Sequence, residues 1–206
     1  MRRASRERRE QEKLELRETI LQAAADLFME QGYDRFSLRQ VAERIGYSAT
    51  TIYLYFQNKD DLLFQVCYEA FQRFSELLLA VLDGPGTPSD RLRAAGEAYV
   101  DFGLTNPSFY HMMFVERTDF LLWEQVHEQG KPLDVLGRLV AVVQEAIDAG
   151  EFKPGNAVAF ADAMWAGVHG IIGILKCIPD LDDERLRQGI RATLDMVFDG
   201  LRMREE

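Results

Sequence analysis

The sequence has few of the residues that build disulfide-bonded or zinc-binding proteins. Its 206 residues include two cysteines, Cys67 and Cys177, which are far apart and form no CxxC pair. Neither a disulfide framework nor a zinc site is therefore expected. Both cysteines have apolar neighbours, and we expect each to be a small buried side chain in a protein of the reducing cytoplasm.

Catalytic and cofactor motifs are also missing. The three histidines, His111, His127 and His169, do not have the spacing of metal ligands. No nucleophile, base and orienting group can be assembled from a motif, and the sequence has no G-x-G-x-x-G segment. An enzyme is therefore the weakest functional hypothesis, and no metal or cofactor is expected.

The sequence has no long uninterrupted apolar segment. Arg2 and Arg3 are followed by no apolar run, which argues against a signal peptide. The most apolar stretch is Ala157–Ile178, but only 13 residues separate its Asp162 from its Lys176. Such a segment is too short to span a bilayer. We expect instead a helix that is buried within the protein or in a subunit interface.

Charge is divided unevenly along the chain, whose formal net charge is −10. Residues 1–59 contain 11 Lys and Arg against 9 Asp and Glu, a net of +2, which leaves −12 for residues 60–206. The acidic total argues against a protein that merely coats nucleic acid. The asymmetry is typical of a chain whose first part meets an anion, although chance variation between segments explains it equally well.

Helical periodicity runs through almost the whole sequence, and no convincing strand-like alternation occurs. A first amphipathic helix has apolar residues every three or four positions and ends near Gly32. The expected fold is all-α, with about nine helices. Capping and loop signals place the later helices at Asn58–Asp83, Arg91–Thr105, Asn106–Val115, Lys131–Gly150, Asn156–Cys177 and Asp183–Arg202.

Two short helices with a tight turn between them are expected from residue 37 to residue 56. Ser37 and Gln40 have the S-x-x-Q spacing of a capping box, and Gly46 has the position of a glycine that ends a helix. Ser48 can then cap a second helix that reaches about Phe56. This helix-turn-helix arrangement is typical of proteins that place the second helix in the major groove of DNA.

The second of these helices has one apolar face and one face that suits nucleic acid. Ile52 and Phe56 are four residues apart and are expected to pack inward. Ala49, Thr50 and Thr51 lie at its exposed end, where short side chains let the backbone approach base edges. Tyrosine hydroxyls further along can donate to phosphate oxygens. The alternative is a helical hairpin whose polar face is only solvated.

Residues Phe36–Leu63, FSLRQVAERIGYSATTIYLYFQNKDDLL, resemble the DNA-binding signature of TetR-family transcriptional regulators. The family pattern is roughly T-x-R-x-I-A-x-x-A-G-V-S-x-x-T-[LI]-Y-x-[HY]-F-x-[SN]-K-x-x-L. It is met at Ser37, Arg39, Val41, Ala42, Gly46, Ser48, Thr51, Ile52, Tyr53, Tyr55, Phe56, Asn58, Lys59 and Leu62, and it is not met at Ile45, Tyr47 and Thr50. Since position 50 lies where such proteins read bases, the operator sequence stays open. The resemblance implies DNA contacts at Arg39, Ser48, Ala49, Thr50, Thr51, Tyr53, Tyr55 and Lys59.

The resemblance also implies a division of the chain. Residues 1–58 would form the DNA-binding domain, and residues 59–206 would form a helical ligand-binding and dimerisation domain. The implied function is a homodimeric repressor that binds double-stranded DNA at a palindromic operator and is released by a small apolar or aromatic effector. The alternative is a helical ligand-binding or interaction module without specific DNA binding.

Small residues recur every three or four positions between residues 159 and 173, which lets another helix come close. Together with apolar residues near the end of the chain, they suggest a dimer contact formed by the last two helices of each subunit. Packing within one chain is the alternative. The residues expected at the dimer interface are Ala159, Ala163, Gly167, Gly170, Gly173, Met196, Val197 and Leu201.

Trp165, His169 and Gly170 form the W-x-x-x-H-G sequence that is characteristic of one C-terminal subtype of the family. Trp165 and His169 share a helix face, and the imidazole would bind either a ligand or a neighbouring helix. An apolar pocket with few polar groups is expected, although the same side chains would serve as ordinary core. The pocket candidates are Tyr99, Phe102, Phe109, Tyr110, Met113, Phe114, Trp123, Trp165 and His169.

The first residues of the chain are rich in arginine. Arg2, Arg3, Arg6, Arg8 and Arg9 alternate with glutamates. Such a segment forms either a basic arm that enters the minor groove or an extended, salt-bridged start of the first helix. The interleaved glutamates favour the helix.

Overall fold

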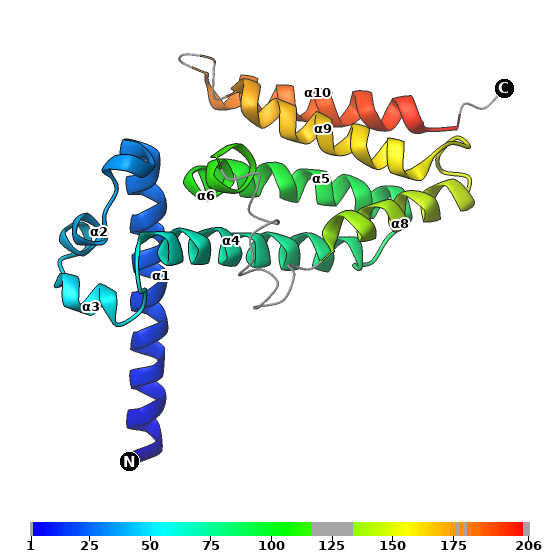
Figure 1. The fold of residues 1–206 in the computed structure, drawn as a ribbon. Coiled ribbons are helices and arrows are strands. Elements are labelled where there is room, and N and C mark those ends of the chain that lie inside the picture. Colours follow the sequence, from blue (N-terminus) through cyan, green and yellow to red (C-terminus); the bar gives the residue numbers. More distant parts are fainter. Residues whose placement is uncertain (1, 117–133, 176–177, 179–180, 204–206) are drawn as a thin grey trace. The chain divides into compact units, whose positions relative to one another are not determined.

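A computed structural model describes residues 2–116, 134–175, 178 and 181–203, and within these ranges the chain is helical and has no strand (Figure 1). The predicted all-α fold is thereby confirmed. In the labels of Figure 1, the elements are α1 (Arg2–Arg35), α2 (Leu38–Ile45), α3 (Ala49–Tyr53), α4 (Lys59–Leu82), α5 (Pro88–Thr105), α6 (Pro107–His111), a π-helical turn (Met112–Glu116), α8 (Val135–Asp148), α9 (Ala157–Leu175) and α10 (Asp183–Leu201).

The described part of the chain divides into two compact units. One unit is Met1–Phe71 with Ser108–Lys131, and the other is Gln72–Pro107 with Pro132–Glu206. The α4 helix belongs to both units, whereas the expected boundary after residue 58 assigned all of α4 to the second. The physical reason is that the first half of α4 supplies apolar side chains to the core of the first unit, namely Leu62, Leu63, Val66 and Cys67.

In the first unit, α1, α2, α3 and the start of α4 surround one apolar core. Ile52 and Phe56 are 0% and 1% exposed, which confirms that they pack inward. Cys67 is buried, as predicted, whereas Cys177 lies outside the described residues. Burial of each large apolar side chain contributes about 1.5–3 kcal/mol to folding, so this core fixes the position of the short α3 helix.

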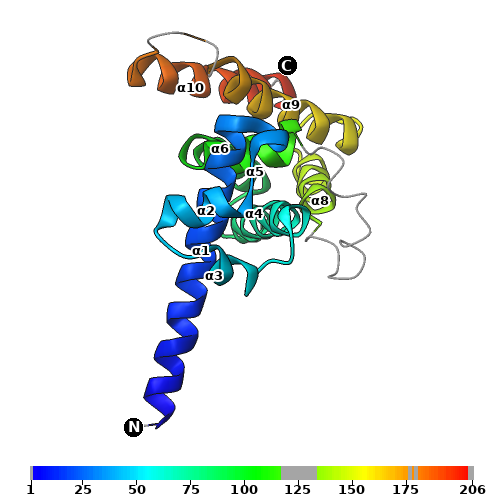
Figure 2. The same cartoon turned by 60° about the vertical axis from the view of Figure 1, so that its left-hand side comes forward.

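In the second unit, α9 packs against α5, α8 and α10, and α9 and α10 lie side by side in both Figure 1 and Figure 2. The α5 helix begins at Pro88, three residues before the predicted start. Thr87 and Asp90 explain the difference because they form a capping box, in which the Asp90 N–H donates to Thr87 Oγ1 at 3.3 Å. The α8 helix begins at Val135 behind the cap residue Asp134, and the predicted start at Lys131 lies outside the described residues.

Arginines link the ends of α4, α5 and α8 in the second unit. Arg91 donates to the carbonyl oxygen of Leu82 at 2.8 Å and also pairs with Glu145. Arg138 bridges Glu145 and Asp83 at 2.8 and 2.6 Å. Hydrogen bonds from Arg138 and Arg91 lower the pKa of the Glu145 carboxyl below its ordinary value. Because the Glu145 carboxylate is exposed, the cluster orients these helix ends more than it stabilises the fold.

The α9 helix contains an 18-residue window, Ala157–Ile174, that is long and apolar enough to cross a membrane by length and composition alone. The sequence analysis predicts no spanning segment because it counts only the 13 residues between Asp162 and Lys176. The longer window meets the criterion because a single aspartate does not exclude it. The core helix of a soluble protein meets the same criterion, and α9 packs against three other helices. Only 28% of the window is buried, so much of α9 is left open on this chain.

Candidate nucleic-acid interface and effector cavity

A tight turn joins α2 to α3 as the sequence predicts. Gly46 ends α2 in the left-handed conformation (φ 73°), and the Tyr47 N–H donates to the Ala42 carbonyl at 2.9 Å. The next residue, Ser48, begins α3 because its Oγ accepts the Thr51 N–H at 3.1 Å. Caps at both sides of the turn therefore set the direction of α3 relative to α2.

The α3 helix ends at Tyr53, earlier than the predicted end near Phe56. The chain continues in a turn in which the N–H groups of Tyr55 and Phe56 both donate to the Ile52 carbonyl, at 2.9 and 3.1 Å. The turn keeps Phe56 on the inward side although regular helix has ended. It leaves Leu54 79% exposed, next to the face that is suited to DNA.

The eight predicted DNA-contact residues lie at or near the solvent surface of the first unit. Four are exposed (Arg39, Ser48, Thr50 and Tyr53), and four are half-buried (Ala49, Thr51, Tyr55 and Lys59). Within the described part of the chain, the Thr50 and Tyr53 hydroxyls have no hydrogen-bond partner, so both can donate to a ligand. The large side chains of Tyr47 and Leu54 are exposed next to these residues in the sequence, and the sequence pattern predicts no role for them.

Two of the predicted phosphate contacts have partners within the protein. Lys59 Nζ donates to the Tyr33 carbonyl at 3.0 Å and lies 3.9 Å from the centroid of the Tyr33 ring. Tyr55 stacks on Phe56 with ring centroids 6.3 Å apart. Each contact orients the side chain, and the Lys59 ammonium retains protons that can be donated to a phosphate.

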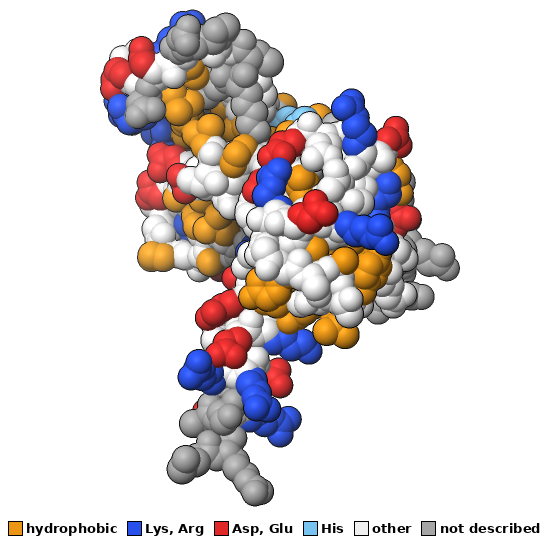
Figure 3. All heavy atoms as spheres, turned by 90° about the vertical axis from the view of Figure 1, so that its left-hand side faces the viewer, with side chains coloured by type: hydrophobic (Ala, Val, Ile, Leu, Met, Phe, Trp, Pro, Cys, Tyr) orange, Lys and Arg blue, Asp and Glu red, His pale blue; other side chains and the backbone are white. Residues whose placement is uncertain are grey.

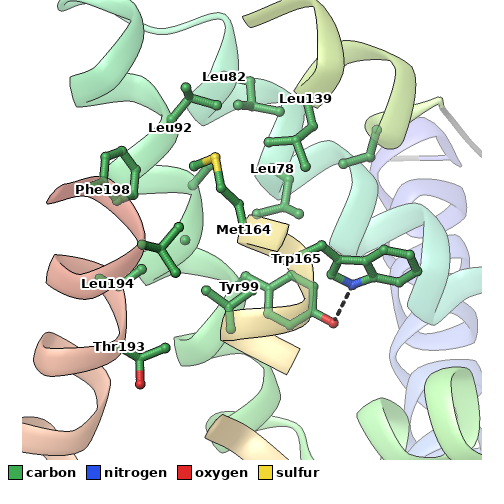
Figure 4. A pocket seen from close by; sticks show the side chains of 15 residues that line it. Leu78, Leu82, Leu92, Tyr99, Leu139, Met164, Trp165, Thr193, Leu194 and Phe198 are labelled. Atoms are coloured by element: carbon green, nitrogen blue, oxygen red, sulfur yellow. Dashed lines mark hydrogen bonds between the residues drawn. The ribbon is translucent and has the colours of Figure 1, made fainter. Parts of the chain in front are cut away.

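The second unit contains a narrow, partly open cavity of about 50 Å³ with an almost wholly apolar wall (Figure 4). Five helices contribute to this wall. Its residues are Leu78, Leu82, Leu92, Ala95, Gly96, Tyr99, Val135, Leu139, Met164, Trp165, Val168, Thr193, Leu194, Val197 and Phe198. A wall of this kind suits an uncharged, apolar part of a ligand.

The few polar groups of the wall are hydrogen-bonded to the protein. Trp165 Nε1 donates to the Tyr99 hydroxyl at 3.1 Å (Figure 4), and that hydroxyl lies 3.1 Å from His169 Nδ1. The Thr193 hydroxyl donates to the Gly189 carbonyl at 2.9 Å. Burial lowers the pKa of His169 below its ordinary value, which favours the neutral ring. The cavity therefore offers neither charge nor unused polar groups to a ligand.

Only part of the predicted pocket lies at this cavity. Tyr99 and Trp165 belong to its wall, and His169 bonds to Tyr99. Phe102 packs instead against Phe74, with ring centroids 5.1 Å apart. The other predicted residues belong to the first unit (Phe109, Tyr110, Met113 and Phe114) or lie outside the described residues (Trp123). In the part of the chain that the structure describes, no group of His, Cys, Asp or Glu could hold a metal.

The residues predicted for a dimer contact divide into two sets. Met196 is 76% exposed, and Ala159, Ala163 and Gly173 are also exposed. Leu201 is buried within the chain, Val197 lines the cavity, and a Cβ at Gly167 would lie 3.2 Å from Val197. The exposed set extends further than predicted, because Val158 and Ile174 of α9 are exposed as well.

Both parts of the sequence match known families. Residues 20–66 match the family described as "Bacterial regulatory proteins, tetR family", and residues 92–175 match that described as "Tetracyclin repressor-like, C-terminal domain". The second description does not name the W-x-x-x-H-G subtype, which stays a prediction. The "Fatty acid metabolism regulator protein" of Bacillus subtilis (strain 168) is 27% identical over 150 residues, which are 72% of this chain and 76% of that protein.

Solved structures share the fold over most of the chain. A protein of unknown function from Rhodococcus sp. RHA1 is 28% identical with a TM-score of 0.71, and the match covers 91% of this chain and 96% of that one. The fatty acid degradation regulator FadR from Bacillus halodurans has a TM-score of 0.71 at 20% identity, covering 91% of this chain and 97% of that one. The proteins matched by sequence are transcriptional regulators rather than enzymes.

Proposed function

The chain belongs to the TetR family of transcriptional regulators and is a DNA-binding regulator, and we propose that it is a cytoplasmic homodimeric repressor released from a palindromic operator by an apolar effector. One observation carries the proposal. The single helix α4 begins at Lys59, beside the α3 region, and ends with Leu78 and Leu82 in the cavity wall. A ligand that moves the wall thus acts on the helix that begins at the DNA-binding region.

The α3 helix supplies the DNA-reading element of this proposal. Ser48 caps it and Ile52 anchors it, so Thr50 and Tyr53 are held outward with hydroxyl groups that no described residue binds. A single short helix reads only a few base pairs, and two of them about 34–36 Å apart would read a palindrome. A dimer is therefore required for specific binding.

The exposed apolar surfaces of α9 and α10 support the dimer. Val158, Ala163, Ile174 and Met196 are exposed although their side chains are apolar, and family members act as dimers. Ala163→Glu should convert the dimer to monomers that retain their helicity, because a carboxylate in an apolar contact costs several kcal/mol. Analytical ultracentrifugation tests this, with Ala141→Glu on the exposed side of α8 as the control. A wild-type monomer at micromolar concentration would refute the dimer.

The chemistry of the cavity favours an effector with an apolar chain. Its wall has no charged side chain, and the name of the Bacillus subtilis relative points to compounds of fatty acid metabolism. Because small-molecule sites usually have about 300–1,000 Å³, the narrow cavity has to widen around such a ligand. Met164 lies in the wall and can change rotamer at little cost. The effector would bind the widened state and shift the population toward it.

Binding of the DNA upstream of the protein's own gene tests both halves of the proposal. Fluorescence anisotropy should show specific binding that weakens steeply with salt. Saturated fatty acids and acyl thioesters of increasing chain length should then raise the melting temperature and weaken DNA binding. Trp165→Ala should abolish that response in a dimer that still binds DNA. A ligand that raises the melting temperature but leaves DNA affinity unchanged would contradict effector release.

A further inference from the structure

The α1 helix extends well beyond the core of the first unit. Residues 6–15 are all exposed, and Ile20 is the first fully buried side chain among the described residues. At about 1.5 Å per residue, the stretch from Arg6 to Ile20 is roughly 21 Å long. Figure 3 shows that charged side chains dominate this projecting segment. The arginine-rich start of the chain is therefore a helix, as the sequence favoured, and not an extended arm.

The charges of this segment are sorted between two sides of the helix. Arg6, Arg9, Lys13 and Arg17 follow one another at intervals of three or four residues and share one side, which we call the basic face. Glu10 also lies on this side, so its formal charge is +3. The opposite side holds Arg8 among the carboxylates of Glu7, Glu12, Glu15 and Glu18, a formal charge of −3.

The basic face continues the buried stripe of α1. The intervals of three and four residues run on from Arg17 through Ile20, Ala24 and Leu27, which are all buried in the core. One side of α1 therefore packs against α2, α3 and α4 in the core, and the basic residues lie on that same side nearer the N-terminus.

Arg17 marks this direction directly. Its guanidinium pairs with Glu69 and donates to Gln65 at 3.1 Å, both on α4. It also lies 5.6 Å from the centroid of the Phe56 ring, just after α3. The basic face thus lies on the side of α1 where α3 and α4 pack, and in Figure 1 the helix runs past both of them. A duplex that contacts α3 and extends along this segment would meet the basic face.

The outer charges of the basic face are available. Arg6, Arg9 and Lys13 are exposed, and none of them forms an ion pair with another described residue, although Glu10 is within one helical turn of each. On the opposite side, Arg8 Nε is paired with Glu12 at 2.7 Å. Two adjacent arginines therefore differ: Arg9 is free on the basic face, and Arg8 is paired on the acidic side.

We propose that the basic face binds backbone phosphates of the operator duplex outside the base pairs that α3 reads. This inference rests on the DNA-binding function. Arg6 and Lys13 are about 10 Å apart along the helix. A duplex carries one negative charge per roughly 1.7 Å of its axis, so the face can meet more than one phosphate. The carboxylates on the opposite side keep that side from binding DNA and so fix the orientation of the segment.

Arg9→Gln and Arg8→Gln form a matched pair that tests this proposal. Both remove one positive charge, at neighbouring exposed positions on different sides of the helix. The probes are a duplex of about 40 base pairs that the protein selects from random sequence, and its central part of about 20 base pairs, which holds two half-sites one turn apart. The dissociation constant is measured across a range of salt concentrations, and helicity is checked by circular dichroism.

On the long duplex, Arg9→Gln should weaken binding and reduce the slope of log affinity against log salt by about 1.8, which is about 0.9 for the one phosphate contact that each subunit of the dimer loses. Arg8→Gln should leave the slope unchanged, and on the short duplex both variants should bind as the wild type does. Equal losses for the two variants on the long duplex would show a general charge effect and overturn the proposal. Binding of the long duplex by Arg9→Gln with the wild-type affinity would overturn it as well. Absence of wild-type binding to either probe would instead refute specific DNA binding itself.

Discussion

The α3 surface and the cavity of the second unit use hydroxyl groups in opposite ways. On α3, the Thr50 and Tyr53 hydroxyls point outward and have no partner among the described residues. In the cavity wall, the hydroxyls of Tyr99 and Thr193 are both hydrogen-bonded within the protein. The first surface keeps its polar groups for a polyanion with many acceptors, and the second presents only apolar surface to its ligand.

The difference shows where each region obtains specificity. At α3, discrimination comes from hydrogen bonds that the free protein leaves unmade, so single hydroxyl groups matter. In the cavity, discrimination comes from the shape and volume of the wall, and its hydroxyl groups act by holding that wall together. Substitutions that remove one group from each region should therefore have different signatures: altered sequence preference at α3, and altered stability at the cavity.

The largest expected effect is the loss of the α3 anchor. Phe56→Ala should lower the free energy of unfolding by about 3–5 kcal/mol and abolish specific DNA binding, because it removes a fully buried ring beneath α3. Urea denaturation and anisotropy measure the two effects. Leu54→Ala, two residues away and highly exposed, should change stability by less than about 0.5 kcal/mol. Similar losses for the two variants would contradict the burial of Phe56.

A smaller and more selective effect is expected at Thr50. Thr50→Val keeps the shape of the side chain and removes its hydroxyl, so stability should change little. Loss of a base contact should cost about 1–3 kcal/mol of discrimination at one position of each half-site. Selection of binding sites from random duplexes, with Thr51→Val as the comparison, measures the preference. An unchanged preference in the Thr50 variant would assign Thr50 to the solvated surface.

The helix-turn-helix region was predictable from sequence because its geometry is set locally. Ser48 and Gly46 act within one turn of their own helix ends, and the inward pair Ile52 and Phe56 follows from helical spacing alone. The end of α3 was misplaced by three residues, since a turn can keep Phe56 on the inward side without regular helix. The spacing of apolar residues predicts the side of a helix on which a residue lies more reliably than it predicts the residue at which the helix ends.

The cavity was less predictable because its wall comes from residues far apart in sequence. Leu78, Leu139 and Leu194 belong to different helices, and each looks like any other apolar residue on an amphipathic stripe. Phe109 and Phe114 are aromatic residues of the kind that a pocket contains, but they belong to the first unit and not to the unit that holds the cavity. Only Trp165 and Tyr99 were identified, and their mutual hydrogen bond is a tertiary contact that no spacing encodes.

At the cavity, Tyr99→Phe should have a moderate effect. The substitution keeps the ring and removes the hydroxyl that bonds to both Trp165 and His169. Loss of these hydrogen bonds should lower the free energy of unfolding by about 1 kcal/mol, whereas DNA sequence preference should stay unchanged. Urea denaturation and site selection test the two halves. A shift in sequence preference without loss of stability would break the contrast between the two regions.

The smallest expected effect is a pH dependence that arises from His169. Burial lowers its pKa in the folded protein below the ordinary value of 6.5, so the unfolded chain takes up a proton first as the pH falls. The stability that this group contributes is complete above pH 6.5 and declines as the pH falls toward the lowered pKa. The Tyr99 hydroxyl can donate to Nδ1 only while that nitrogen is unprotonated, which favours the neutral ring as well.

His169→Gln should therefore reduce the difference in urea midpoint between about pH 7.5 and pH 5.5, values on either side of the ordinary histidine pKa. An equal or larger difference in this variant would show that His169 does not titrate as its burial requires.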